Sequence, residues 1–374
     1  MGNSARLIAW LAATCATFTL TAWSGSARAG GMDPVPERLV LQPPGLPAGQ
    51  TCQSIAYNPE IAVQSGTLPN SFPCIPNHAA FRNIASELGF AIAPTAFHPA
   101  RTTGFGGLAL TLEASFTKIN ASGETNDGNR VKYWEEGSRG SIDRNQNQFS
   151  IRNNAPDSLL QVYALKARKG LPFGFELTTS MGHIVNTELF VMGADVQWSV
   201  LEGFRSGALG YLPDVSVGTG VRTLVGSSKM YLTTIGIDAR ISKPFAIADS
   251  AELTPFAGYQ RLMIFGNSTI MDFTPNVDPL QQCGYNGPDA ETGAPRCRNK
   301  LSNGADANAD FNNNSTFQSV RIHRHRGLFG LSYKYDIFYV AGQFAVDLSS
   351  PDSENNQVNG ARQWTLSLEG GLHF

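Results

Sequence analysis

The sequence contains little charge and, beyond its start, no long apolar run. Only 16% of its 374 residues are charged, and the formal net charge is −2. After the first 25 residues, no stretch holds the roughly 18 consecutive apolar residues that a membrane-spanning helix needs. The mean hydropathy of −0.15 also argues against a helical membrane protein. The near-zero net charge gives no reason to expect nucleic acid as a partner.

Common signatures of catalytic and metal sites are missing as well. No Cys-x-x-Cys spacing indicates zinc, and no Gly-x-Ser-x-Gly elbow indicates a hydrolase. Cysteine itself is scarce, with five residues. We therefore expect no enzymatic activity and no resident cofactor.

What is present begins with a secretory signal peptide at residues 1–29. Arg6 supplies the cationic start, Leu7 to Trp23 the apolar core, and Ala27-Arg28-Ala29 the cleavage site. The mature chain would keep four cysteines, and an even number in an exported protein favours disulfides. Of the three pairings of Cys52, Cys74, Cys283 and Cys297, the local one (Cys52 with Cys74, Cys283 with Cys297) is favoured, because about 200 residues separate the two pairs.

Residues 30–105 form a separate N-terminal segment, rich in proline at first and then helical. Asn77 can cap a helix whose apolar residues recur at helical spacing, from Phe81 to Leu88, and Gly89 is a stop signal. Two placements fit this helix. It is a plug that enters a barrel from the periplasm, or it lies against the periplasmic rim or the membrane surface.

From Leu108 onward, apolar and polar side chains alternate, which is typical of strands with one apolar face. The pattern predicts ten strands, with eight and twelve as alternatives, because boundaries carry errors of two to four residues. The stretch 159–168 alternates less cleanly, and 251–265 does not reveal its faces. The ten stretches are 108–118, 159–168, 173–181, 190–200, 214–222, 231–241, 251–265, 318–335, 337–348 and 363–374.

The last stretch carries a family resemblance. Its apolar residues fall at alternate positions from Trp364 to Phe374, as in the terminal strand of Gram-negative outer-membrane β-barrel proteins. The resemblance covers the signal peptide, the barrel pattern and Phe374, but matches no specific family. It implies an all-β, antiparallel, up-and-down transmembrane barrel over residues 106–374 in the outer membrane. Its partners would be outer-membrane lipid, lipopolysaccharide and the barrel-assembly machinery, which would read Phe374; the oligomeric state is left open.

The predicted inward positions collect charges of both signs. Two interpretations stand: a structural ladder of salt bridges that fills a narrow barrel, or a weakly selective path. The lumen-lining charges are Glu113, Lys166, Arg168, Glu176, Asp195, Asp214, Arg222, Asp238, Arg240, Arg324, Arg326, Asp347 and Glu369.

The predicted outer loops are 119–157, 267–317 and 349–361. In the second, Asp306, Asn308 and Asp310 space oxygen ligands as calcium loops do, although an ordinary solvated loop is the favoured interpretation. The run from Arg321 to Arg326 follows that loop, and its cationic side chains could contact lipopolysaccharide phosphates.

Three functions fit these patterns. The favoured one is a narrow channel or transporter for small solutes across the outer membrane. The alternative is a surface-exposed structural or adhesive barrel that binds a partner through its long loops. A third, disfavoured, is a hydrolase of omptin-like architecture, because His323 and His325 lack the accompanying Asp-x-His and Asp-x-Asp sequences.

Overall fold

The computed structural model describes twelve segments of the chain. Residues 1–30, Cys52, Cys283 and the predicted calcium loop lie outside them, so the signal peptide, the cysteine pairings and the calcium site stay predictions. Cys74 is disulfide-bonded. The described residues are 31–41, 74–95, 98–123, 132–139, 153–203, 211–248, 251–273, 285–288, 290–291, 295–297, 314–348 and 361–374.

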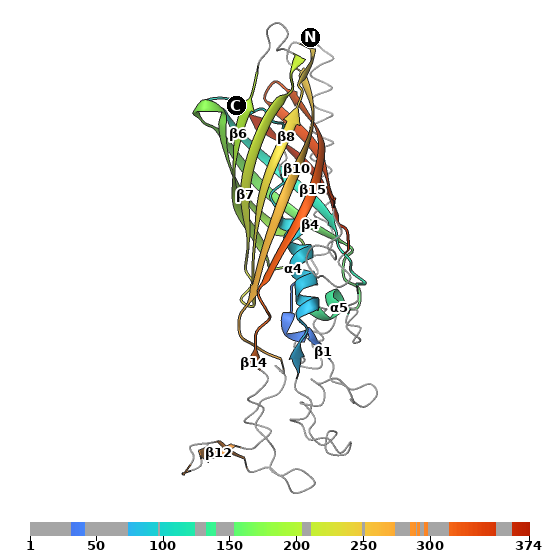
Figure 1. Ribbon diagram of the computed structural model, residues 1–374, viewed down its shortest axis with the longest axis vertical. Coiled ribbons are helices and arrows are strands. Elements are labelled where there is room, and N and C mark those ends of the chain that lie inside the picture. The colour runs from blue at the N-terminus through green and yellow to red at the C-terminus, as the bar shows by residue number, and fades with distance from the viewer. Residues whose placement is uncertain are drawn as a thin grey trace, which may run out of the picture.

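Ten long antiparallel strands close into a ring (Figure 1). Each strand pairs with its neighbours along the chain, and pairing of β17 with β3 joins the last strand to the first. The predicted ten-stranded, up-and-down barrel is therefore confirmed. The strands are β3 (Leu108–Lys118), β4 (Leu159–Gly170), β5 (Phe175–Ile184), β6 (Phe190–Leu201), β7 (Asp214–Val225), β8 (Met230–Ser242), β10 (Ala251–Ser268), β15 (Val320–Tyr335), β16 (Phe338–Asp347) and β17 (Trp364–His373).

Shorter strands and helices lie in the segments that precede and connect the barrel strands. Helix α4 (His78–Ile92) is the longest helix described, and no described helix is both long and apolar enough to cross a membrane. The others are η1 (Pro36–Arg38), β1 (Val40–Leu41), β2 (Ile75–Pro76), α5 (Tyr133–Gly137), η3 (Pro172–Gly174), β9 (Phe245–Ala248), β11 (Met271–Asp272), β12 (Tyr285–Pro288), β13 (Pro295–Cys297) and β14 (Asn314–Ser315).

The two ends of the barrel differ in their connections. At the short-turn end, β15 and β16 are joined by two residues, and Leu108 and Phe374 donate backbone hydrogen bonds to each other, at 3.1 and 2.7 Å. The opposite, long-loop end carries the connections 119–158, 269–319 and 348–363. Helices α4 and α5 and strand β14 lie toward this end, away from the chain end at Phe374 (Figure 1).

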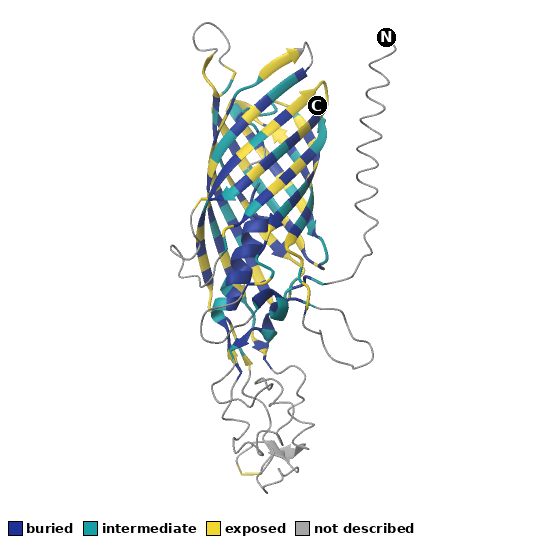
Figure 2. Cartoon of the chain, turned by 90° about the vertical axis from the view of Figure 1, so that its right-hand side faces the viewer, coloured by how far each residue is buried: buried dark blue, intermediate teal, exposed yellow. Residues whose placement is uncertain are grey.

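The wall alternates between exposed and buried side chains (Figure 2). Ile237 on β8 is 51% exposed, whereas its neighbour Asp238 is 7% exposed. Phe175 and Trp198 stack on the outside with their ring centroids 5.8 Å apart. The outer face of the barrel is thus broadly apolar, as lipid contact requires.

Helix α4 lies inside the ring at the long-loop end. It contacts β3, β4, β7, β8, β10 and β15, strands from around the whole ring, so it cannot rest on a rim or on an outer surface. It reaches the lumen at the long-loop end, whereas the sequence-based hypothesis placed plug entry at the short-turn, periplasmic end. Asn77 caps the helix by accepting a 3.0 Å hydrogen bond from the Ala80 N–H.

The sequence predicts that the helix stops at Gly89, and this prediction is wrong. The helix continues to Ile92 and ends before Pro94, because a proline disfavours helical backbone in the residue before it. Gly89 instead allows close contact with the wall. A Cβ at this position would lie 2.5 Å from the Cγ2 atom of Ile264 on β10.

The inner wall is apolar where it surrounds α4. This explains why the stretches 159–168 and 251–265 alternated poorly, since there apolar residues occupy both faces of a strand. The buried inward residues include Leu160, Val162, Val191, Leu232, Leu262, Ile264 and Ile322, which form one apolar core with Phe81, Ile84 and Leu88 of the helix.

Candidate functional site: the occupied lumen

The charged side chains predicted to line the lumen all lie on the inner side of the wall. Twelve of the thirteen are buried, and Asp195 is half-buried. Most of them lie in the part of the lumen between the tip of α4 and the short-turn end, whereas the pair Arg324 and Asp347 lies beside the helix, where Arg324 donates a 3.1 Å hydrogen bond to Ser86. The strands bring most of them together as pairs of opposite charge.

One cluster joins β3, β4, β5 and β17. The Lys166 ammonium contacts the carboxylate of Glu113 and lies 3.4 Å from that of Glu369. Arg168 lies 3.5 Å from Glu369 and 3.9 Å from Glu176. Four strands are therefore linked by two cations shared among three acids.

The remaining contacts are simpler pairs. Arg222 binds Asp195 in a bidentate manner, with N–O distances of 2.9 and 2.6 Å, which is the strongest geometry for an arginine and a carboxylate. The other two pairs are Arg240 with Asp238, at 2.6 Å, and Arg324 with Asp347.

Two of the predicted charges have other contacts. Asp214 accepts a 3.1 Å hydrogen bond from the backbone N–H of Gly203. The Arg326 guanidinium lies 4.7 Å from the ring centroid of Phe90 on α4, and that of Arg324 lies 4.6 Å from the same ring. Cation–π attraction therefore attaches the end of the helix to β15.

A buried carboxyl group holds α4 to the long-loop cap. The side chain of Glu87 accepts hydrogen bonds from the Tyr133 hydroxyl at 2.8 Å, from the Trp134 indole at 2.7 Å and from the Asn120 N–H at 3.0 Å. Burial nonetheless raises the pKa of Glu87, because it outweighs the lowering effect of these donors and of Arg324.

After α4 the chain continues through the lumen as a luminal strap, which we define as residues 93–95 and 98–107. Thr95 donates a 3.1 Å hydrogen bond to Glu113 and accepts one of 2.8 Å from Lys166. The Gln260 amide donates to the carbonyl of Pro94 at 3.0 Å. The strap thus starts within the largest charge cluster.

Further along, the strap binds the wall mainly through its backbone. Ala100 donates its N–H to Ser242 at 2.9 Å and accepts from Gln197 at 3.0 Å. The N–H of Thr103 donates to Glu176 at 2.7 Å. Helix and strap together therefore run from the long-loop end to the short-turn end.

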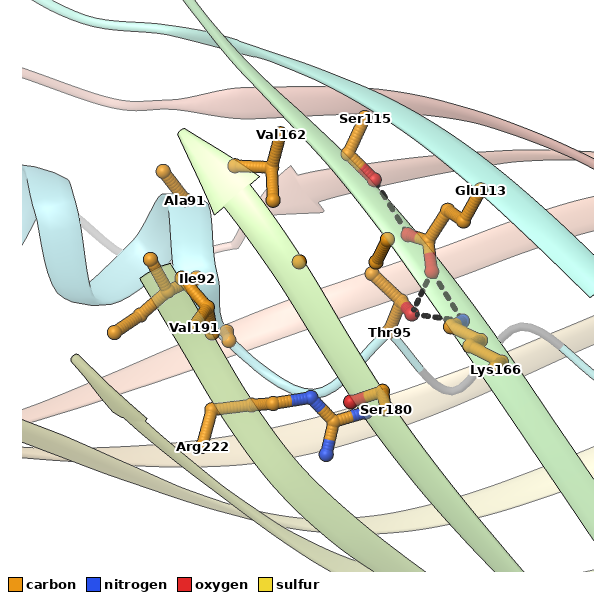
Figure 3. A pocket seen from close by; sticks show the side chains of 13 residues that line it. Ala91, Ile92, Thr95, Glu113, Ser115, Val162, Lys166, Ser180, Val191 and Arg222 are labelled. Carbon is orange, nitrogen blue, oxygen red and sulfur yellow. Dashed lines mark hydrogen bonds and ion pairs between the residues drawn. The ribbon is translucent and has the colours of Figure 1, made fainter. Parts of the chain in front are cut away.

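A cavity of about 30 Å³ lies beside the junction of helix and strap (Figure 3). Thr95, Glu113 and Lys166 form a hydrogen-bonded group on one side of it, and Arg222 lies on another side (Figure 3). This volume has room for one or two water molecules, so the lumen is nearly filled here.

A larger cavity of about 280 Å³ lies at the short-turn end. Its lining includes Arg101 of the strap together with Arg168, Tyr339 and His373 of the wall. The rings of Tyr339 and His373 stack with centroids 4.2 Å apart, and a guanidinium nitrogen of Arg168 lies 2.7 Å from the ring Nε2 of His373. This cavity is a polar vestibule at the short-turn end of the lumen, next to the luminal strap.

The run Arg321–Arg326 divides between the two faces of β15. Arg324 and Arg326 point inward and are buried, whereas Arg321, His323 and His325 are on the outer face. Within the described segments, no group of three or more His, Cys, Asp or Glu residues is arranged to hold a metal ion.

The chain's own geometry defines its class, which is that of closed, antiparallel, ten-stranded β-barrels with an apolar outer face and an occupied lumen. No family model matches the chain, and no curated protein sequence matches it. Solved structures similar to it include Ail, the attachment invasion locus protein of Yersinia pestis, at 10% identity and a TM-score of 0.23. They also include the N-terminal β-barrel domain of Pseudomonas aeruginosa OprF, at 11% and 0.24, and Neisserial surface protein A, at 10% and 0.26.

Each of these likenesses covers 72% of this chain and 99% of the other chain. At such identities and TM-scores they carry no argument about activity, ligand or partner. Any functional argument must come from the lumen and the outer wall of this barrel.

Sequence reasoning missed the residues of the inner wall that make room for the luminal strap. Inward glycines make room for it: a Cβ at Gly220 would lie 3.0 Å from the Cβ of Pro94, and one at Gly236 would lie 3.4 Å from the proline Cγ. The available signal was glycine at inward positions of adjacent strands, which indicates close approach of another chain segment.

Proposed function

We propose that the protein is a narrow channel for small solutes in the outer membrane of a Gram-negative bacterium, closed by its own N-terminal segment. One observation carries the proposal: helix α4 and the luminal strap occupy the lumen, yet the ring closes through strand pairing alone. Displacing the segment would leave the backbone hydrogen bonds between barrel strands in place.

The contacts of the strap suit reversible displacement. They are hydrogen bonds to polar and charged side chains, which water can replace at a modest net cost of about 0.5–1.5 kcal/mol each, or roughly twice that where a partner is charged. The wall that faces the strap would then expose acids and bases in pairs, a mixture that favours small polar solutes without strong selection by charge. The wall around α4 would expose apolar side chains.

The opened lumen would be narrow. Eight strands leave an interior that side chains fill, whereas sixteen to eighteen leave a wide aqueous channel. Ten strands lie near the closed end of this range, so a single barrel suits small solutes rather than bulky ones.

A disulfide lock on the helix tests the proposal. A Cβ placed on Gly266 of β10 would lie 3.4 Å from the Cβ of Ala85, close to the spacing of about 3.8 Å found in disulfides. The double variant Ala85→Cys/Gly266→Cys should therefore attach α4 to the wall. We expect wild-type protein in planar bilayers to show conductance steps, the oxidised variant to be silent, and reductant to restore the steps.

The controls are the two single variants and wild-type protein with reductant, since reductant also reaches the native cysteines. A variant lacking residues 30–105, checked for heat-modifiable migration, should conduct steadily. Silence of both the wild type and this deletion variant would refute the channel and favour the alternative function, a structural or adhesive barrel acting through its long loops.

We also propose that the cysteines pair locally, Cys52 with Cys74 and Cys283 with Cys297, and that the protein catalyses no reaction. Support for the second pair comes from the hairpin of β12 and β13, in which Cys297 lies opposite Tyr285, two residues after Cys283. Non-reducing peptide mapping tests this: free thiols at Cys283 and Cys297 in protein from cells would refute that pair.

A further inference from the structure

The outer face of the ten barrel strands holds no Asp or Glu at any outward position. Basic residues do occur there, and they are unevenly distributed. Four of the seven lie on the neighbouring strands β10 and β15. The seven are Lys118, Lys169, His183, Arg261, Arg321, His323 and His325.

The registers bring these four residues together. Arg261 of β10 is the direct cross-strand partner of His325 of β15. Two further pairs along the same ladder join Met263 to His323 and Phe265 to Arg321. Residues on one face of an antiparallel pair are close enough to act on one ligand, so the four form one basic surface, which we call the outer basic patch.

The patch contains a preformed element. The Tyr259 hydroxyl hydrogen-bonds to Nδ1 of His325, and the two rings lie 5.8 Å apart. This contact orients the imidazole beside Arg261. The patch therefore combines two guanidinium groups with at least one positioned imidazole.

The outer basic patch lies toward the long-loop end of β15. Trp364 of β17 pairs with Val346 of β16, which pairs in turn with Gly327 of β15. His325, His323 and Arg321 are two, four and six residues beyond that row, toward the long-loop end. Because the strands of such barrels are tilted by about 35–45°, this row is not level with the membrane plane. Arg321 follows Val320, the first residue of β15, so the patch extends to the long-loop end of the wall.

We infer that the outer basic patch is a binding site for the phosphate groups of lipopolysaccharide. At the long-loop end, the surrounding lipid surface would be the outer leaflet, whose lipid A carries phosphates on a sugar backbone next to the acyl chains. Arginine binds phosphate through paired, charge-assisted hydrogen bonds. The neighbouring outward residues, such as Ile237 and Phe329, are exposed and apolar and would contact the acyl chains.

The test is native mass spectrometry of the purified full-length protein with bis-phosphorylated lipid A. We compare it with the same lipid after removal of its phosphates and with phosphatidylglycerol. The variant Arg261→Gln/Arg321→Gln should bind bis-phosphorylated lipid A about tenfold or more weakly than the wild type, because it removes both guanidinium groups of the patch and with them the paired, charge-assisted hydrogen bonds to phosphate. The matched control is Lys118→Gln/Lys169→Gln, which removes two outward cations elsewhere and should bind as the wild type does.

Heat-modifiable migration of both variants establishes that the barrel is folded. Unchanged binding by Arg261→Gln/Arg321→Gln would overturn the site, and so would equal binding of lipid A with and without phosphates. An equal loss in the lysine control would show diffuse electrostatic attraction instead of a site. The assignment to lipopolysaccharide would be overturned if the wild type bound phosphatidylglycerol in preference to lipid A and if Arg261→Gln/Arg321→Gln weakened the binding of both lipids to the same degree.

Discussion

At the scale of single residues, the contact between Gly89 and Ile264 controls how closely α4 approaches the wall. A methyl group at Gly89 would meet three side-chain atoms of Ile264 at 2.5–3.0 Å. Overpacking of this kind costs about 1–3 kcal/mol, more than the roughly 0.5–1 kcal/mol that Gly→Ala contributes in a helix. We expect Gly89→Ala to lower the free energy of unfolding, measured in phospholipid vesicles.

The control is a double-mutant cycle with Ile264→Ala, which removes all three of the clashing atoms. In that background Gly89→Ala should be neutral or stabilising, because its methyl group enters the space left by the isoleucine. Additive losses in the double variant would contradict the proposed contact.

A second prediction for a single residue concerns Glu87 and the dependence of protein stability on pH. Burial raises the pKa of Glu87 above its ordinary value of 4.5, so the folded protein holds this proton more tightly than the unfolded chain does. The stabilising contribution is complete below the unfolded pKa and is lost as the pH rises through the folded value. We expect stability to fall with rising pH above about 4.5 by more in wild-type protein than in Glu87→Gln, measured by unfolding midpoints at several pH values. Parallel profiles of the two proteins would contradict this.

At the scale of elements, the seam between β17 and β3 determines whether the ring is complete. Phe374 exchanges two backbone hydrogen bonds with Leu108 and is 63% exposed. Deleting Phe374 removes both bonds and an exposed aromatic residue at the end of the last strand. We expect a clear loss of heat-modifiable barrel in the membrane fraction, larger than that caused by any single loop substitution.

Phe374→Tyr is the matched control, because it keeps the backbone and the aromatic ring. It should assemble as the wild type does. A deletion variant with normal barrel yield would refute the role of this residue in closing or delivering the last strand.

At the scale of the whole molecule, the orientation of the barrel decides which end meets the surroundings of the cell. The short turns and Phe374 should face the periplasm, so the long-loop end should face outward. Ser228 is exposed in a turn at the long-loop end, and Tyr211 is 88% exposed in a turn at the other end. We expect an impermeant maleimide to label Ser228→Cys in intact cells and Tyr211→Cys only after lysis.

Both variants should be labelled in lysed cells, which serves as the control for reactivity. The reverse labelling pattern in intact cells would show that the barrel has the opposite orientation, with its short-turn end outward. That orientation would also move the outer basic patch to the inner leaflet, away from lipopolysaccharide.

Much of this architecture could be predicted from the sequence because the decisive signal is local. The period of two assigns each residue of a strand to one face, and lipid requires apolar residues at nearly every outward position. The period of two alone therefore places Ile237 and Asp238 on opposite faces of their strand, without any knowledge of strand pairing. The ten strands and the inward charges follow from the same rule.

The occupant of the lumen was decided only by the tertiary structure. An inward position faces whatever fills the barrel, so Leu160 and Ile264 are apolar because α4 lies against them, and Gly89 is small because Ile264 approaches it. These residues come from distant parts of the chain, and no local period relates them. Likewise, the closeness of Arg261 to His325 depends on the pairing of β10 with β15, which only the closed ring sets.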